Sequence, residues 1–214
     1  MIFVAIFTIK RVGIIMTITY IVGNGIYVNL TNRCTNRCSF CIRNNGDGAY
    51  GSDSLWLERE PTVEEVLADF EKYDMSKYDE IVYCGYGEPT IRIDTLLETA
   101  KVLKEKYKKP IRINTNGQGS LINKRNIAPL FKHIIDTVSI SLNAADAESY
   151  EKMCLPVYGK KAYEALIEFG RECVPYVKNV LFSVVRQTLS EDEISACEQI
   201  AKKAGVKLRI RELV

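Results

Sequence analysis

The sequence has almost no net charge, and it lacks a hydrophobic run near its start that is long enough to cross a membrane. Its 29 Lys and Arg residues against 27 Asp and Glu residues give a formal net charge of +2, too small for the charge footprint of a nucleic-acid-binding or membrane-surface protein. The apolar run over residues 1–9 ends at Lys10 and Arg11, and it lacks the basic start and cleavage site of a signal peptide. Partners must therefore be inferred from specific sites.

Histidine is scarce, because His133 is the only one in the chain. The sequence also lacks the cysteine pattern of a disulfide scaffold or an exported protein, since three of its seven cysteines are crowded between Cys34 and Cys41. Such crowding favours thiolate metal ligands in a reducing cytosol. We therefore expect a cytoplasmic protein.

The composition predicts one domain with its own core. A chain of 214 residues, 47% of them hydrophobic, buries one sizeable core and is too short for two large domains. A strand-like pattern begins at Thr17, so we predict an N-terminal extension over residues 1–16, with translation starting at Met16, and a single domain over residues 17–214. The alternative is that residues 3–9, which are rich in β-branched side chains, form an additional edge strand.

Strand-like and helical patterns alternate along the rest of the chain. Two strand-like runs between Thr17 and Thr31 flank the turn Gly23-Asn24-Gly25, which predicts an N-terminal β-hairpin arm. Further strands are predicted at residues 80–84, 111–115, 137–142, 179–185 and 207–210, and apolar stripes mark helices at 63–70, 96–107 and 194–204. The fold class is therefore α/β, a partial (βα)6 TIM-like barrel of six parallel strands.

The predicted strands alternate between apolar and polar residues, although parallel strands buried on both faces are usually apolar throughout. With a period of two, the apolar residues face the helices and the polar ones point into the barrel. The polar set is Asn29, Thr31, Arg112, Asn114, Asn116, Ser139, Ser141, Asn143, Arg209 and Arg211. Burying a polar side chain without a partner costs about 1–3 kcal/mol, so we expect a polar ligand or water in the lumen. The alternative is an antiparallel sheet with one wet face, which the crossover helices disfavour.

Cys34, Cys38 and Cys41 form a C-x3-C-x2-C cluster directly after the first barrel strand, at the end where such barrels place their chemistry. Three thiolates can each hold one iron of a [4Fe-4S] cluster, and the missing fourth ligand leaves one iron open to a substrate or cofactor. The alternative is structural zinc, which needs four Cys or His ligands. His133 is distant, and the side chain of Cys84 is predicted to face the helices.

Residues 31–41, Thr-Asn-Arg-Cys-Thr-Asn-Arg-Cys-Ser-Phe-Cys, resemble the signature of the radical S-adenosylmethionine (SAM) superfamily. In that signature an aromatic residue precedes the last cysteine, and Phe40 matches it as a cofactor contact. The resemblance implies a [4Fe-4S] cluster on the three cysteines and SAM as the second cofactor. The remaining cysteines, Cys154, Cys173 and Cys197, lack ligand spacing and are expected to be ordinary buried thiols.

The run Gly85-Tyr86-Gly87-Glu88-Pro89-Thr90 resembles the Gly-Gly-Glu-Pro motif of the superfamily, with Tyr86 inserted between the glycines. Glycines permit close backbone approach, and Glu88 offers an acceptor to an ammonium group. The resemblance implies that the backbone around Gly85, Gly87 and Glu88 binds the methionine amino group of SAM. The alternative is a simple turn.

The segments ending at Gly117 and Asn143 resemble the Thr-Asn-Gly and Ser-Leu-Asp segments of the superfamily. Asn116 is a further predicted cofactor contact, and Ser141 and Asn143 are the preferred ribose contacts.

Three arginines have open assignments. Arg186 is predicted to pair with the cofactor carboxylate, the alternative being an exposed loop charge. Arg209 is a further cofactor candidate, whereas Arg209 and Arg211 could instead anchor an acidic substrate or neutralise carboxylates in the lumen.

Residues 26–214 are identified as a minimal radical SAM core, and within the superfamily the cysteine run and the Gly-Tyr-Gly-Glu-Pro-Thr variant resemble the TatD-associated proteins. The resemblance implies reductive cleavage of SAM to a 5'-deoxyadenosyl radical, which abstracts hydrogen from an unknown substrate. A protein or peptide substrate fits the glycine-rich loop at residues 44–54, which we expect to be a mobile lid.

The alternatives are an activating enzyme for a glycyl radical protein and a non-catalytic iron-sulfur redox module that partners a TatD-type hydrolase. A one-electron donor such as flavodoxin or ferredoxin is an implied partner. Nothing in the sequence signals a membrane or direct nucleic-acid binding.

Overall fold

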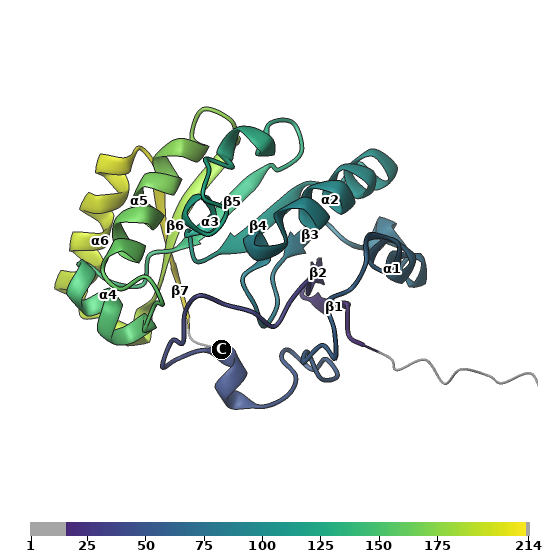
Figure 1. Cartoon of the computed structure of the whole chain (residues 1–214), viewed down its shortest axis with the longest axis horizontal. Coiled ribbons are helices and arrows are strands. Elements are labelled where there is room, and N and C mark those ends of the chain that lie inside the picture. The colour runs from purple at the N-terminus through teal and green to yellow at the C-terminus, as the bar shows by residue number, and fades with distance from the viewer. Residues whose placement is uncertain (1–15, 213–214) are drawn as a thin grey trace, which may run out of the picture.

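The computed structural model describes residues 16–212, and its strands form one seven-stranded sheet (Figure 1). The strands are β1 (Thr19–Val22), β2 (Gly25–Val28), β3 (Glu80–Tyr83), β4 (Ile111–Thr115), β5 (Thr137–Ser141), β6 (Asn179–Val185) and β7 (Lys207–Arg211). They follow the chain order across the sheet, and the sheet does not close on itself. The predicted N-terminal extension, apart from Met16, lies outside the described residues.

The hairpin arm and the six parallel strands are confirmed. β1 pairs antiparallel with β2, with Val22 opposite Gly25, and each later strand pairs parallel with the one before it. The hairpin loop has two residues, and Gly23 takes a φ of +55° at its first position, a conformation that glycine adopts at little cost. Parallel pairing also removes the alternative of an antiparallel sheet.

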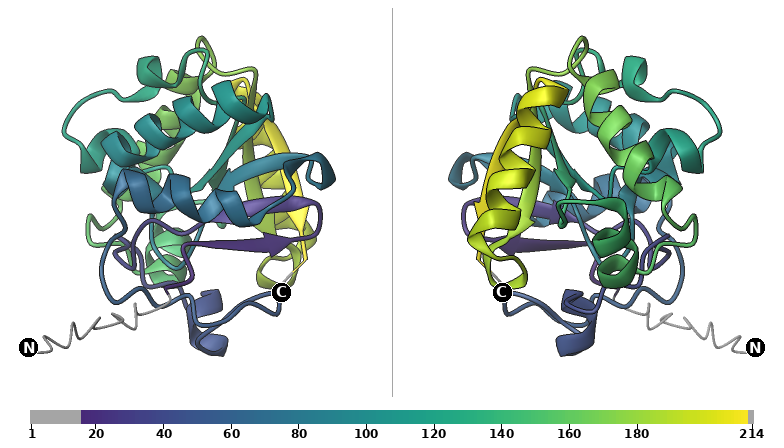
Figure 2. Two further views of the ribbon diagram at one scale, coloured as in Figure 1. Left: turned by 90° about the vertical axis from the view of Figure 1, so that its right-hand side faces the viewer. Right: turned by 90° about the vertical axis from the view of Figure 1, so that its left-hand side faces the viewer.

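Helices fill the connections between the parallel strands (Figure 2). They are α1 (Val63–Asp69), α2 (Ile93–Tyr107), α3 (Gly119–Ile122), α4 (Ala147–Cys154), α5 (Lys161–Cys173) and α6 (Glu191–Ala204). Capping boxes start α1 at Thr62 and α6 at Ser190, because each hydroxyl accepts from the third backbone N–H of its helix and the glutamate there reaches back. Among residues 16–212, none of the helices is long and apolar enough to span a membrane.

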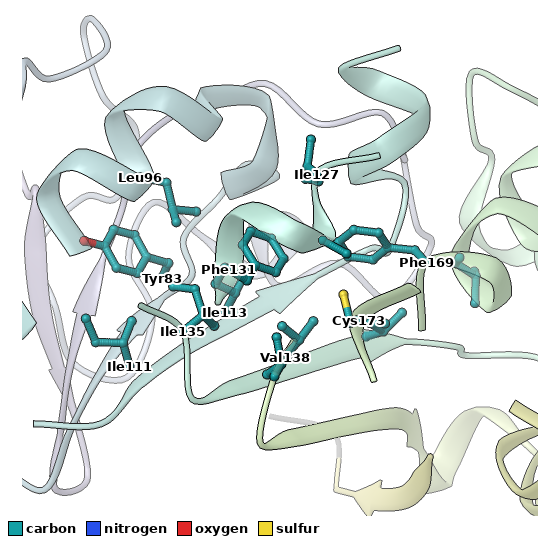
Figure 3. Close-up of a cluster of buried hydrophobic side chains, with 14 of the residues drawn as sticks. Tyr83, Leu96, Ile111, Ile113, Ile127, Phe131, Ile135, Val138, Phe169 and Cys173 are labelled. Carbon is teal, nitrogen blue, oxygen red and sulfur yellow. The ribbon is translucent and has the colours of Figure 1, made fainter. Parts of the chain in front are cut away.

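The hydrophobic core lies between the sheet and these helices (Figure 3). Ile111, Ile113 and Val138 contribute the apolar positions of β4 and β5, and all three are fully buried. The rings of Phe131 and Phe169 pack edge to face in the same layer, with centroids 6.1 Å apart. The period of two predicted correctly that these apolar residues face the helices. The polar positions of the strands lie on the opposite face of the sheet.

Candidate functional site

The polar face of the sheet lines a cavity of about 430 Å³. Eight of the ten polar residues predicted to point inward line it: Arg112, Asn114, Asn116, Ser139, Ser141, Asn143, Arg209 and Arg211. The side-chain oxygens of Asn114 and Asn143 are buried without a hydrogen-bond partner in the described part of the chain. An unpaired buried acceptor costs free energy, so these atoms suit a ligand that donates hydrogen bonds or a bound water.

Asn29 and Thr31 correct the prediction, because neither lines the cavity. The Asn29 amide donates to the carbonyl of Leu55 at 2.7 Å, and the Thr31 hydroxyl donates to Glu60 Oε1 at 2.7 Å. Residues 55–60 fold back over the end of β2 and supply these partners. Each side chain therefore donates a hydrogen bond to residues 55–60, while Asn29 Oδ1 is buried without a partner among the described residues.

Cys34, Cys38 and Cys41 line the same cavity, each half-buried and free of disulfide bonds. Burial and the negative charge of Glu88 raise the pKa of Cys34 to about 11. A metal ion or cluster that binds this thiol must therefore displace its proton.

The cysteine loop is anchored on the end of α4. The backbone N–H of Arg37 donates to the carbonyl of Cys154 at 2.9 Å, and that of Ser39 donates to the carbonyl of Met153 at 3.1 Å. A hydrogen bond with Cys154, together with burial, raises the pKa of the Cys38 thiol. Cys154 is fully buried, as predicted, yet it lies directly behind a predicted iron ligand, which its sequence spacing did not indicate.

Arg43 is a site residue that the sequence analysis missed. Its Nε donates to Cys41 Sγ at 3.3 Å, and its terminal nitrogens donate to the carbonyls of Asn32 at 3.3 Å and Asn36 at 3.4 Å. One guanidinium thus spans the cysteine loop and contacts a predicted iron ligand. Its position two residues after the last cysteine was the available signal.

A buried network of polar side chains also holds the cysteine loop. The Gln118 amide donates to Asn36 Oδ1 at 2.8 Å, and the Asn36 amide donates to Tyr150 Oη at 2.8 Å. All three side chains are buried, so the network is shielded from water and fixes the loop against α3 and α4. It brings together segments that are far apart in the sequence, and no local pattern indicated it.

Glu88 is buried at the cavity wall, and its carboxylate is already a hydrogen-bond acceptor within the protein. Oε1 accepts from Thr90 N at 3.0 Å, from Thr90 Oγ1 at 2.6 Å and from Thr115 Oγ1 at 2.7 Å. Oε2 accepts from Asn116 N at 2.7 Å. Burial raises the pKa of Glu88, and these hydrogen bonds oppose the rise. The side chain therefore ties β3 to β4 as well as facing the cavity.

Gly85 and Gly87 line the cavity, and they are required by the close approach of two chain segments. A Cβ on Gly87 would lie 2.2 Å from the Thr31 carbonyl oxygen, and one on Gly85 would lie 2.1 Å from Asn29 Oδ1. Glu88 N also donates to the Arg33 carbonyl at 2.8 Å. The glycine motif is thus packed against the residues that lead into Cys34, which couples it to the cysteine loop.

Cys84 corrects a second prediction, because it lines the cavity instead of facing the helices. On β3, Tyr83 takes the helix side, where its hydroxyl lies 2.7 Å from that of Thr99 in α2. Since consecutive residues of a strand point to opposite faces, Cys84 must point inward. Burial raises the pKa of its thiol.

Arg186 lies outside the cavity lining, in contrast to its predicted contact with the cofactor. Its guanidinium pairs with Glu191 at 2.9 Å and Glu212 at 3.7 Å, at the end of β6. The alternative of an exposed loop charge therefore describes its position. Phe40, by contrast, lines the cavity beside the cysteines and packs against the core.

The loop at residues 44–54, which we expect to be a mobile lid, makes tertiary contacts. Tyr86, the residue inserted in the glycine motif, is buried and donates its hydroxyl to the Gly46 carbonyl at 2.8 Å. Its ring packs edge to face on Trp56, with centroids 5.0 Å apart. Tyr86 is therefore the loop's anchor, whereas the side chain of Tyr50 is about half exposed.

We expect Tyr86→Phe to accelerate amide hydrogen exchange in residues 46–55 about fivefold, because the variant loses one hydrogen bond worth about 1 kcal/mol. Exchange followed by mass spectrometry measures this effect. Tyr50→Phe is the matched control and should leave exchange unchanged. Equal exchange in the Tyr86→Phe variant and the original chain would show that the loop is held by other contacts.

No three Cys, His, Asp or Glu side chains converge on one metal-ion position within residues 16–212. A cubane cluster is held differently, since each cysteine binds a different iron and the sulfurs need not meet at one point. For a cluster, the relevant observation is therefore that the three cysteines line the same cavity.

Comparisons with known proteins agree with this geometry. Residues 28–201 match the family model of the Radical SAM superfamily. A probable GTP 3',8-cyclase from Thermococcus kodakarensis is 30% identical over 187 residues, which are 87% of this chain and 55% of that protein. The dual-specificity RNA methyltransferase RlmN from Nautilia profundicola is 26% identical over 184 residues, 79% of this chain and 47% of that protein.

Solved structures share the architecture. HydG, a maturase of the [FeFe]-hydrogenase, has a TM-score of 0.63 at 16% identity over 89% of this chain and 42% of that chain. Methylornithine synthase (PylB) has a TM-score of 0.60 at 13% identity over 89% of this chain and 53% of that chain. At such identities the likeness shows the fold alone, and it confirms the predicted partial barrel. The chain spans about half the length of the curated relatives named above.

Proposed function

This chain belongs to the radical SAM superfamily, whose enzymes use a [4Fe-4S] cluster and SAM, and we propose that Cys34, Cys38 and Cys41 hold that cluster. When bound, the two cofactors supply a one-electron reductive cleavage that starts hydrogen abstraction from a substrate. The observation that carries the proposal is that the three free thiols share one cavity wall with Glu88 and Asn116.

The residues of the cavity fit these cofactors. Three cysteines supply one fewer ligand than a cubane has irons, which leaves one iron for SAM. The unpaired oxygen of Asn143 is a ready acceptor for a ribose hydroxyl, and the hydroxyl of Ser141 lines the same wall. Asn143 holds a φ of +58°, a left-handed conformation that concentrates at functional sites.

Each cofactor contact has its own role in this proposal. Glu88 and the backbone of Gly85 and Gly87 receive the methionine amino group, because Oε2 of Glu88 accepts a single hydrogen bond from residues 16–212. Phe40 lines the cavity next to the cysteines and packs against the core, so it would contact a bound cofactor there. Asn116 lines the same cavity and its amide donates to Thr35 Oγ1 at 2.8 Å, so it would connect a bound SAM to the cysteine loop.

Arg43 acts as a positioning residue in this proposal. Its hydrogen bond to Cys41 Sγ places a positive charge beside a thiolate ligand, and such charge stabilises the deprotonated sulfur. The guanidinium also holds two carbonyls of the loop, so it restrains the backbone as well as the sulfur.

The substrate and the partners belong to this proposal only in outline. Superfamily enzymes need a one-electron donor, for which flavodoxin or ferredoxin are candidates, and free thiols suit the reducing cytosol. The motif resemblance supports a TatD-associated enzyme, and the glycine-rich loop at residues 44–54 supports a protein or peptide substrate. We transfer neither the cyclase nor the methyltransferase activity, because the chain spans about half of those relatives.

The test is whether the anaerobically reconstituted, reduced chain cleaves SAM to methionine and 5'-deoxyadenosine, measured by mass spectrometry. We expect cleavage that requires both reductant and cluster. A chain that holds the cluster but leaves SAM intact would instead be a non-catalytic redox module. Adding a candidate glycyl radical protein or TatD-type hydrolase to the same assay tests those partners directly.

We expect Glu88→Ala to weaken SAM binding at least about tenfold, because hydrogen bonds to charged groups contribute about 1.5–3 kcal/mol. The structure adds a second expectation, a free energy of unfolding lower by about 3 kcal/mol, since four donors in β3–β4 lose their acceptor. Calorimetric titration and urea denaturation measure the two effects.

The matched control for Glu88→Ala is Thr90→Val, which removes one donor to Glu88 and keeps the carboxylate. Its SAM affinity should stay within about threefold of the original chain, because Thr90 is not a proposed SAM contact and the Glu88 carboxylate remains. Iron content should be unchanged in both variants, because neither residue is a proposed iron ligand. Unchanged SAM affinity in Glu88→Ala would show that the motif is a simple turn and does not bind SAM.

A further inference from the structure

Arginine side chains outnumber carboxylates in the lining of the cavity. Three guanidinium groups line the wall, those of Arg112, Arg209 and Arg211, against two carboxylates, those of Glu88 and Glu212. The four hydrogen bonds described above already engage Glu88.

Two of these charges already have partners from outside the cavity. Arg112 pairs with Glu80 at 2.6 Å and donates to Tyr27 Oη at 3.2 Å. Glu212 pairs with Arg186 at 3.7 Å. Arg209 and Arg211 make no ion pair within residues 16–212, so two guanidinium groups at the cavity wall lack a counter-charge from the described chain.

The direction of both arginines is fixed by β7. Leu208 and Ile210 alternate with them and pack against the core, which turns Arg209 and Arg211 to the cavity side. Ser183 on β6 stands opposite Arg209 in the sheet, and Ser141 on β5 stands opposite Ser183. A row of two hydroxyls therefore leads from the predicted ribose contact to the first arginine.

Tyrosine side chains also line the cavity. Tyr20 and Tyr27 pack with ring centroids 5.4 Å apart, and Tyr50 lines the wall beside them. Burial raises the pKa of Tyr50 and of Cys84, and the positive charge of Arg211 opposes that rise at both groups. Arg211 therefore lies near enough to Tyr50 and Cys84 for its charge to act on both, and these residues line the same cavity as Tyr20 and Tyr27.

We propose that Arg209 and Arg211 bind an acidic group of the substrate, a carboxylate or a phosphate, while the body of the substrate lies against Tyr20, Tyr27 and Tyr50. Guanidinium groups match both anions with paired N–H donors, and tyrosine rings pack on an organic body at low entropic cost. This inference rests on the proposed function, because it assigns the part of the cavity that the proposed cofactor contacts leave open. It gives the substrate class as an organic acid or an organic phosphate.

The proposal is tested by site-resolved modification of the cluster-reconstituted chain with phenylglyoxal, read by peptide mass spectrometry. Inorganic phosphate and succinate are the probes, each added separately. At a probe concentration about four times its Kd, modification of Arg209 and Arg211 should slow about fivefold. Arg171, an exposed residue of α5 that pairs with Glu168, is the internal control and should not change.

Each outcome has a fixed meaning. Protection by phosphate alone would identify the substrate as an organic phosphate, and protection by succinate alone would identify it as a carboxylate. Protection by both probes would mean that the site accepts either anion. Absence of protection by either probe overturns the proposal, and so does protection of both arginines by SAM alone, which would make them cofactor ligands. Arg211→Gln should abolish the protection of Arg209, whereas Arg171→Gln should preserve it.

This experiment does not depend on turnover. Anion protection is read without reductant, whereas the proposed function is read as SAM cleavage. A chain that cleaves SAM without anion protection refutes only the substrate class, and one that binds anions without cleaving SAM refutes only the enzymatic function.

Discussion

Replacing Cys34, Cys38 and Cys41 together with alanine should reduce bound iron from about four per chain to background, because each thiolate holds one iron and no other group of the chain has the spacing to replace them. The characteristic absorption of the cluster should disappear with the iron. Iron and sulfide analysis after anaerobic reconstitution measures the loss. Zinc should be counted in the same samples, since zinc binding by the original chain would favour the structural-metal alternative.

Two control variants make the cysteine experiment specific. Cys197→Ala removes a buried thiol of α6 that does not line the cavity, so this variant should keep the cluster. Cys84→Ala removes a thiol that lines the cavity without the ligand spacing, and it should also keep four irons. Retention of four irons in the triple variant, or their loss in Cys84→Ala, would contradict the assignment of the three ligands.

Gly87→Ala should lower the free energy of unfolding by about 3 kcal/mol or more, because its Cβ would lie 2.2 Å from the Thr31 carbonyl oxygen and 2.5 Å from that of Arg33. Both contacts are with backbone, which cannot move aside as a side chain can. The shift should separate Glu88 N from the Arg33 carbonyl and displace the residues that lead into Cys34. We therefore expect weaker SAM binding and a lower cluster content as well.

Urea denaturation of the cluster-free chain measures the stability loss without a contribution from the metal. The matched control is Gly119→Ala, at the start of α3, whose Cβ would meet side-chain atoms of Ile127, Phe169 and Thr90. These side chains can adjust, so the cost should be less than about 1 kcal/mol. Equal stability of the two alanine variants would mean that the glycine motif tolerates a side chain and is not packed as described.

Local sequence patterns predicted the strands because alternation is a property of the strand itself. β4 and β6 have the predicted bounds, and the alternation of Ile111 and Ile113 with Arg112 and Asn114 assigned the two faces correctly. The pattern failed at β3, where Ile81, Val82 and Tyr83 are all fully buried. In a strand that is apolar on both faces, the sequence does not show which residues face the helices and which face the cavity. The inward direction of Cys84 could therefore not be determined from the sequence.

The sequence by itself determined the ligand chemistry, because the spacing of the three cysteines and of the glycine motif lies within short segments. Only the tertiary structure decided what those segments touch: Cys154 behind Cys38, four donors around Glu88, and Glu60 at Thr31. It also turned Arg186 toward carboxylates and left Arg211 facing the cavity. Such partners come from segments that are distant in the chain, and a hydrogen bond or an ion pair depends on distances in space that spacing in the sequence does not encode.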